Sequence, residues 1–165
     1  MKRNSVPHYF SVSDIGCGYG GFLQRLQDNF SNDRFSYAGF DLAKSPIAYC
    51  ERNYAKKGAQ FYLNGIPTEM ADYSVMSGTF NYAPGITVEA WKDYLFTTLN
   101  SIWNLTRCSM IFNLMISEED KITSQSISYI RKETILNFCH SNFGATYEHF
   151  SSKLPREITF CVSKT

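Results

Sequence analysis

The chain has 165 residues, which is the length of one domain with a single sizeable hydrophobic core. Hydrophobic residues make up 44% and charged residues 19%, as in globular proteins, and a net charge of +1 gives no basis for general electrostatic capture of nucleic acid or acidic lipid. The five cysteines form no C-x-x-C pair, so no metal site is predicted. Without a signal peptide or a run of roughly 20 apolar residues for a membrane span, we expect a reduced, cytoplasmic protein.

Residues 1–10 are polar and mixed, and we expect them to form an N-terminal segment, a loop or a lid, ahead of a single domain over 11–165. The stretch 11–21 is extended up to Asp14, and glycines then alternate with other residues. Glycine permits backbone angles that a side chain forbids and lets the backbone come close to a ligand. We interpret 11–21 as a cofactor-binding turn between a strand and a helix.

The next elements repeat the strand–helix order. Apolar residues at helical spacing predict a helix from about 20 to 29, and a second short strand is predicted over 37–42. Ser45-Pro46 is typical of a helix start, with the hydroxyl at the N-cap and proline at the first helical position, and Gly58 is expected to end this helix.

Two further strands precede the clearest helix of the sequence. The third strand is predicted over 59–63 and closes at Asn64-Gly65, and the fourth covers 73–77. From Val88 onward, apolar residues recur at helical spacing. They are Trp91, Leu95, Leu99 and Ile102.

The last third of the chain completes the pattern. The nearly all-apolar run 109–116 predicts a strand buried on both faces, and an acidic loop follows at 118–120. A helix is predicted over 132–142, and the extended runs 145–152 and 157–163 are joined closely enough for an antiparallel hairpin.

Alternating strands and helices predict an α/β fold with a parallel sheet covered on both faces. Ligands of such sheets bind outside the carboxyl ends of the strands. The 16–20 turn, Asp41, Asn64-Gly65, 77–82 and 117–120 all lie on this predicted edge, and we look for the candidate site residues there.

The glycines alone fit two kinds of cofactor. Gly16, Gly18 and Gly21 match G-x-G-x-x-G, and Asp41 follows at the distance that a dinucleotide fingerprint requires. Asp14, two residues ahead of Gly16, argues against this because a carboxylate at a pyrophosphate site would repel the ligand. The same carboxylate would attract a cationic amino group.

Asp14-Ile15-Gly16-Cys17-Gly18-Tyr19-Gly20 closely resembles the D-x-G-x-G-x-G first motif of class I S-adenosylmethionine-dependent methyltransferases, and the resemblance extends over about 11–163. It implies a Rossmann-like three-layer sandwich with a mostly parallel seven-stranded sheet and an antiparallel C-terminal hairpin. It also implies S-adenosylmethionine as cofactor and S-adenosylhomocysteine as product. In that family an acid at Asp41 binds the ribose hydroxyls, although a turn or capping aspartate is an alternative interpretation of this residue. The implied cofactor-binding residues are Asp14, Gly16, Cys17, Gly18, Gly20, Asp41, Leu42, Asn64, Gly65, Ile66, Ser77 and Gly78.

More narrowly, 75–81, the Trp91 helix and Phe112-Asn113-Leu114 resemble small bacterial methyltransferases, some of which occur with surface-sugar biosynthesis. This implies a small-molecule or sugar-type acceptor, methylated at oxygen. The fourth-strand motif is not the N/D-P-P-Y of nucleic-acid amino-methyltransferases, which argues against a nucleic-acid acceptor. The adenine turn lacks the acid that the family often places there, so Asn64 or the backbone must serve.

Methyl transfer is an in-line displacement, which depends chiefly on how donor and acceptor are held. His8, Asn81 and Tyr82 are the candidate catalytic residues, and no base is assigned among them. Tyr19, Phe80, Asn81 and Tyr82 are candidates for the acceptor wall or, alternatively, for ordinary packing. Two other functions stay open: a non-catalytic cofactor-binding partner subunit of a methyltransferase complex, and an NAD-binding protein. A homo-oligomer also stays open.

Overall fold

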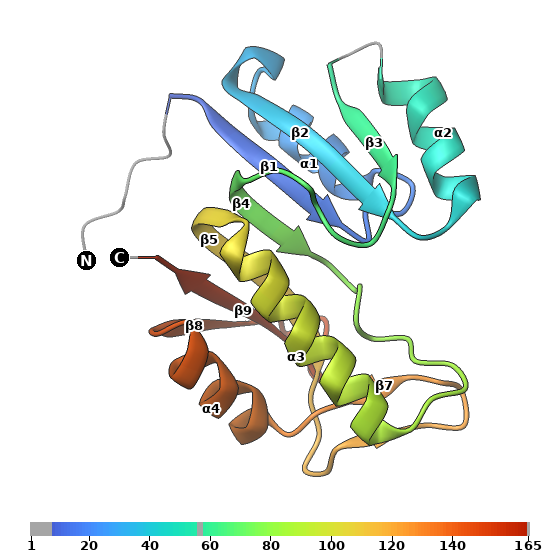
Figure 1. Ribbon diagram of the computed structural model, residues 1–165, viewed down its shortest axis with the longest axis vertical. Helices are drawn as coiled ribbons and strands as arrows, with labels where there is room; N and C mark the ends of the chain where they lie inside the picture. Colours follow the sequence, from blue (N-terminus) through green and yellow to red (C-terminus); the bar gives the residue numbers. More distant parts are fainter. Residues whose placement is uncertain (1–7, 56–57, 165) are drawn as a thin grey trace.

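The computed structural model describes residues 8–55 and 58–164, and strands and helices alternate along most of this range (Figure 1). The main sheet has seven strands in the order β3-β2-β1-β4-β5-β9-β8. Strands β1 to β5 are parallel, and β9 runs antiparallel between β5 and β8. The strands are β1 Phe10–Ile15, β2 Phe35–Asp41, β3 Gln60–Leu63, β4 Ala71–Met76, β5 Thr106–Met115, β8 Thr146–Phe150 and β9 Glu157–Ser163. The final antiparallel hairpin predicted from the sequence is therefore present.

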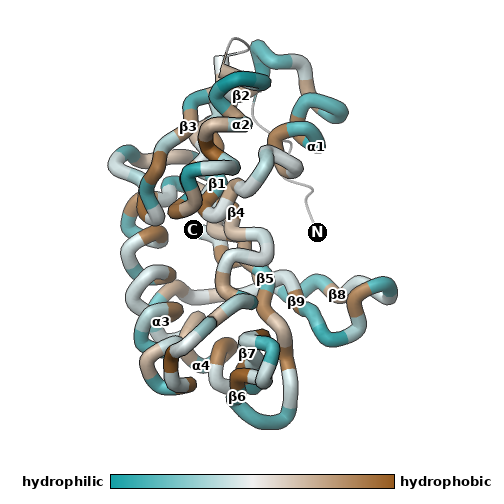
Figure 2. The backbone as a smooth tube through the Cα atoms, turned by 90° about the vertical axis from the view of Figure 1, so that its right-hand side faces the viewer, coloured by the Kyte–Doolittle hydropathy of each residue, from teal (hydrophilic) through white to brown (hydrophobic). Residues whose placement is uncertain are grey.

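Two pairs of helices lie on opposite faces of this sheet. The helices are α1 Gly21–Asn29, α2 Lys44–Tyr54, α3 Val88–Asn104 and α4 Lys132–Asn142, and a 3-10 turn, Asn32–Arg34, leads into β2. One hydrophobic core joins α1 and α2 to β1, β2 and β3, and a second joins α3 and α4 to β4, β5 and β9. Figure 2 shows α1 and α3 on opposite sides of the strands. No helix in the described part of the chain is long and apolar enough to cross a membrane.

The predicted helices form where the periodicity places them, with one local difference. The side chain of Thr87 caps α3 by accepting a hydrogen bond from the Ala90 N–H at 3.2 Å, and the predicted apolar face of this helix is buried. The predicted N-cap of α2 is wrong, because this helix begins at Lys44 and its N-cap is Ala43. Ser45 and Pro46 lie inside the first turn, where a missing proline N–H costs no helical hydrogen bond.

The sheet is less evenly covered than the sequence predicted. On β5, Met110, Phe112 and Leu114 are fully buried against α3 and α4, whereas Asn113 and Met115 on the other face are only half-buried. The prediction of a strand buried on both faces is therefore wrong. The reason is that α1 and α2 pack beside the other half of the sheet, around β1, β2 and β3.

The chain between β5 and α4 forms a small unit that the sequence did not reveal. It contains the short antiparallel strands β6 Lys121–Ile122 and β7 Ser128–Tyr129. Asp120, only 12% exposed, fixes this unit to α3 through Lys92 Nζ at 2.6 Å and to the start of α4 through the Arg131 N–H at 2.7 Å. The acidic loop is thus partly structural, since one of its carboxylates holds the unit in place.

Leu99→Ala tests the core beneath α3. Leu99 is completely buried, so the substitution should lower the free energy of unfolding by about 2–5 kcal/mol through lost burial and a residual cavity. Leu154→Ala is the matched control, because Leu154 is 53% exposed in the hairpin loop and should change stability by about 0.5 kcal/mol or less. Urea denaturation measures both, and equal losses in the two variants would contradict this core.

Candidate functional site

The glycine turn joins the ends of β1 and β2. The N–H groups of Gly16 and Cys17 both donate to the carbonyl oxygen of Phe40, at 2.8 and 3.0 Å. Gly16 has a φ of +74°, and a Cβ there would lie 2.6 Å from Oγ1 of Thr79, which itself donates to the carbonyl of Ile15 at 2.6 Å. Both its backbone angle and its contact with Thr79 therefore require glycine at this position.

Asp14 lies beneath the turn and is 2% exposed. Its carboxylate accepts a hydrogen bond of 2.5 Å from the Tyr37 hydroxyl. Burial raises the pKa of Asp14 from 3.8 to about 6, and the Tyr37 bond opposes part of this rise. At neutral pH the site thus holds a buried negative charge with one side-chain donor, which would favour a cationic group above it.

Asp41, at the end of β2, ties together the turn and the start of α2. One carboxylate oxygen accepts from the Gly18 N–H at 2.9 Å, and the other from the Ala43 N–H at 2.8 Å. The second bond is the turn interaction that was the alternative interpretation of this residue. Because a carboxylate has about four acceptor positions, these two bonds leave it able to accept hydrogen bonds from a ligand.

Two adjacent cavities meet at the glycine turn, and both are bordered by Gly16 and Ser77. We call the first the β2-side cavity; its volume is about 260 Å³. Its lining residues are Ile15, Gly16, Asp41, Leu42, Gly65, Ser77, Gly78, Thr79 and Tyr94. We call the second the α1-side cavity; its volume is about 430 Å³. Its lining residues are Asp14, Gly16, Cys17, Gly18, Gly21, Phe22, Arg25 and Ser77.

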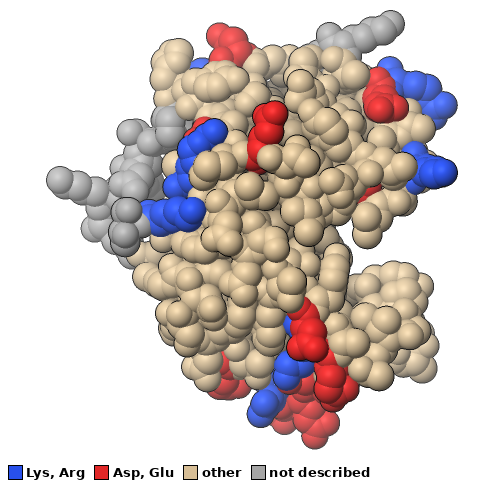
Figure 3. Space-filling view, viewed as in Figure 1, with Lys and Arg blue, Asp and Glu red and all other residues tan. Residues whose placement is uncertain are grey.

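The two cavities follow the carboxyl ends of β1, β2 and β4, and cofactor sites are commonly about 300–1,000 Å³. Figure 3 shows a notch on this side of the molecule, bordered mainly by uncharged side chains. The two cavities together can therefore hold one elongated ligand that lies across these strand ends and turns its polar groups toward them.

The sequence has a curated relative of similar length. "Putative methyltransferase Rv1506c" from Mycobacterium tuberculosis (strain ATCC 25618 / H37Rv) is 32% identical to this chain over 122 residues, which cover 73% of this chain and 72% of the relative. The chain belongs to this methyltransferase family. No family model matches the sequence.

Solved methyltransferases share the fold of this family member. Magnesium protoporphyrin IX methyltransferase (ChlM) from Synechocystis PCC 6803, with bound SAM, has a TM-score of 0.70 at 12% identity, covering 98% of this chain and 72% of its own. The CurJ carbon methyltransferase has a TM-score of 0.71 at 9% identity, over 96% and 50% of the two chains. An O-methyltransferase family protein from Burkholderia thailandensis has a TM-score of 0.70 at 11% identity, covering 94% of this chain and 51% of its own. The predicted Rossmann-like methyltransferase fold is thus confirmed.

Most of the predicted cofactor residues of this methyltransferase line the two cavities. Gly20, Asn64 and Ile66 do not. Gly20 is instead the left-handed N-cap of α1, where a Cβ would lie 2.9 Å from the ring of Tyr54. Asn64 and Ile66 flank Gly65 in the turn after β3, and Ile66 is 40% exposed.

Five side chains border the cavities without being among the predicted cofactor-binding residues: Ile15 at the end of β1, Thr79 after β4, Phe22 and Arg25 on α1, and Tyr94 on α3. Phe22 and Arg25 lie one helical turn apart, directly after the glycine turn. This spacing is the signal that would have found them.

The candidate catalytic residues of the methyltransferase have different positions. His8 lies before β1, at the opposite end of the strand from the glycine turn, roughly 20 Å away by strand geometry. Asn81 accepts from the Met115 N–H at 3.3 Å and donates to Glu157 at 3.4 Å, so its side chain links the segment after β4 to β5 and β9. The structure therefore brings neither His8 nor a free Asn81 amide to the turn.

The candidate acceptor wall is divided in the same way. Phe80 is 1% exposed, and its carbonyl accepts hydrogen bonds from Trp91 and Ser128, so it belongs to the core rather than to a pocket wall. Tyr82 is exposed, and its backbone pairs with Ile127 in an isolated bridge. Tyr19 is also exposed and packs edge-on against Tyr49.

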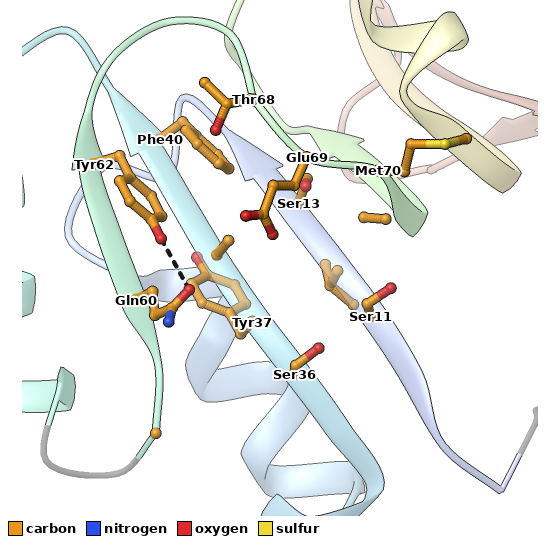
Figure 4. Close-up of a pocket in the computed structure, with 14 residues that line it drawn as sticks. Ser11, Ser13, Ser36, Tyr37, Phe40, Gln60, Tyr62, Thr68, Glu69 and Met70 are labelled. Atoms are coloured by element: carbon orange, nitrogen blue, oxygen red, sulfur yellow. Dashed lines mark hydrogen bonds between the residues drawn. The ribbon is translucent and has the colours of Figure 1, made fainter.

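A separate concavity of about 180 Å³ lies on the face of β1, β2 and β3, away from the glycine turn (Figure 4). The segment 64–70 crosses this face without forming a helix, and Thr68, Glu69 and Met70 form its border. The strand side chains beneath include the small polar Ser11, Ser13 and Ser36 together with the rings of Phe40 and Tyr62. This concavity is therefore open to solvent, and none of its lining residues belongs to the glycine turn.

Gly16→Ala tests the close packing at the turn of this methyltransferase. The added methyl group would overlap Thr79, so the variant should unfold more easily than Gly85→Ala. Gly85 has nearly the same φ, +70°, with open space where a Cβ would lie, and therefore carries the backbone strain alone. We expect an additional loss of about 1–3 kcal/mol in Gly16→Ala, measured by urea denaturation. Equal losses would show that Thr79 gives way freely.

Asp14→Asn tests the buried carboxylate. Because the folded protein holds the Asp14 proton up to a pKa of about 6, its contribution to stability is complete below about pH 4 and is lost as the pH rises through 6. Relative to the unsubstituted protein, Asp14→Asn should therefore gain about 2 kcal/mol in unfolding free energy between pH 4.5 and pH 7.5. Asp28→Asn, at an exposed position on α1, should show no such change. A pH-independent difference for Asp14→Asn would contradict the raised pKa.

Proposed function

We propose that this methyltransferase binds S-adenosylmethionine along the carboxyl ends of β1, β2 and β4 and transfers its methyl group to a small, hydroxylated acceptor. The observation that carries the proposal is the pair of carboxylates, Asp14 and Asp41, on either side of a glycine turn that borders both cavities. ChlM, which shares the fold, was crystallised with SAM and with SAH.

The residues fit the two halves of this cofactor. In the β2-side cavity, Asp41 has acceptor positions for the ribose hydroxyls, and Leu42, which is 73% exposed, offers an apolar surface to the adenine ring. Ile66 lies beside Gly65 on the same edge and offers a second apolar side chain. In the α1-side cavity, the negative charge of Asp14 suits the amino group of the methionine end, and the turn backbone can approach closely because Gly16 and Gly18 have no side chains.

S-adenosylmethionine supplies an electrophilic methyl group on a sulfonium. In the proposed reaction the acceptor oxygen bonds to the methyl carbon as the carbon–sulfur bond breaks in line, and the hydroxyl proton leaves to solvent. The chain's contribution is to hold the two reactants at near-attack distance. Gly16 and Ser77 border both cavities, and Gly78 lies beside Ser77 in the β2-side cavity; these small residues leave space for the acceptor.

We propose a sugar-type or similarly hydroxylated small molecule, methylated at oxygen, as acceptor. Beyond Ser77 the chain is fixed by backbone pairing: Ala83 donates its N–H to the carbonyl of Ser126 at 2.8 Å, and Tyr82 pairs with Ile127. This pairing leaves the Tyr82 ring exposed. An exposed tyrosine ring suits a hydroxylated molecule, and the small net charge of the chain argues against a polyanion such as nucleic acid.

Asp41→Asn tests cofactor binding. The amide has one acceptor oxygen instead of two, so the affinity for S-adenosylhomocysteine should fall about 10- to 100-fold, measured by calorimetric titration. Because Asp41 also accepts two backbone N–H groups, a thermal melt must show that the variant is folded. Asp28→Asn is the matched control and should bind normally. An analogue without the ribose 2′-hydroxyl should bind the unsubstituted protein weakly, with little further loss in Asp41→Asn.

Three outcomes would contradict parts of this proposal. Full affinity in Asp41→Asn would remove the ribose role, and binding of NAD without S-adenosylhomocysteine would overturn the choice of cofactor. Turnover, followed by S-adenosylhomocysteine release, can be screened with free sugars, nucleotide-activated sugars and phenols. Cofactor binding without turnover on any of these would favour the alternative, a cofactor-binding partner subunit.

A further inference from the structure

The α1-side cavity is lined by one positively charged side chain to which the proposed function assigns no role. Arg25 lies one turn into α1, directly after the glycine turn, and lines this cavity together with Asp14 and Gly18. Among the described residues that line the two cavities, Arg25 is the one basic side chain. The α1-side cavity therefore has a buried carboxylate on one wall and a guanidinium on another.

Arg25 is available to a ligand. Its side chain is exposed, and within residues 8–55 and 58–164 no carboxylate lies at ion-pair distance from it. Asp28, three residues further along α1, forms no ion pair with it either. The carboxylate of Asp14 is already engaged with the Tyr37 hydroxyl, 2.5 Å away. The guanidinium can thus turn its donors to an anion that enters the cavity.

We propose that Arg25 binds the carboxylate at the amino-acid end of the cofactor, an assignment that rests on the proposed function. The amino-acid end is a zwitterion, and the cavity presents one charge of each sign to it. The amino group lies toward Asp14, and the carboxylate lies toward Arg25, whose planar guanidinium can donate two parallel hydrogen bonds. Recognition of the carboxylate makes the protein discriminate against cofactor forms that lack it.

The test compares two ligands and four proteins by calorimetric titration. The ligands are S-adenosylhomocysteine and its decarboxylated analogue, which keeps the amino group. The proteins are the unsubstituted chain, Arg25→Gln, Arg25→Lys and the control Arg52→Gln. Arg52 is also exposed, but it lies in the last turn of α2, away from the carboxyl ends of the strands.

Arg25→Gln should weaken S-adenosylhomocysteine binding roughly tenfold and leave the decarboxylated analogue unchanged, since only the first ligand has the carboxylate. Arg25→Lys should retain part of the affinity, Arg52→Gln all of it, and the remaining binding in Arg25→Gln should depend less on salt. The inference is overturned if Arg25→Gln weakens both ligands equally or neither. If the unsubstituted protein binds neither ligand, the proposed function fails, and this inference fails with it.

Discussion

The arrangement of the site depends on one carbonyl group, that of Phe40 at the end of β2. It accepts hydrogen bonds from two successive N–H groups of the glycine turn, so the turn cannot move away from β2 without losing both. Thr79, which follows β4, attaches a third strand end to this point, because its hydroxyl donates a hydrogen bond to the carbonyl of Ile15 at the end of β1. The ends of β1 and β2 and the segment after β4 are therefore bound to one another at a single point.

This constraint explains why side chains are excluded from the turn. With Thr79 packed on one side, only a hydrogen atom fits at Gly16, and its positive φ is a backbone angle that a residue with a side chain rarely adopts. Asp41 then fixes the next part of the turn by accepting from Gly18. The structural and the proposed binding roles of Asp41 do not compete, because the carboxylate has more acceptor positions than the backbone occupies.

The sequence predicted this part of the molecule well because its determinants are local. Strand, glycine and acid follow one another within a few residues, and the second acid ends the next strand at the expected distance. The role of Phe80 was not predictable, because it is decided by Trp91 and Ser128, which bind its carbonyl from other segments. Strands β6 and β7 have two residues each, too few for a hydrophobic period. Asp120 gains its structural role from Lys92 on α3 and from the Arg131 N–H at the start of α4, neither of which is close to it in the sequence.

Two features of the site oppose stability and are consistent with a ligand of mixed character. Burial of an ionised Asp14 at neutral pH costs free energy that a neutral side chain of the same shape would not. Leu42 leaves most of its side chain in water beside Asp41, whereas leucines such as Leu23 and Leu99 are buried in the two cores. A ligand that places a cation near Asp14 and an apolar ring on Leu42 relieves both costs at once. The fold therefore places these two unfavourable features at an edge where a bound molecule can offset them.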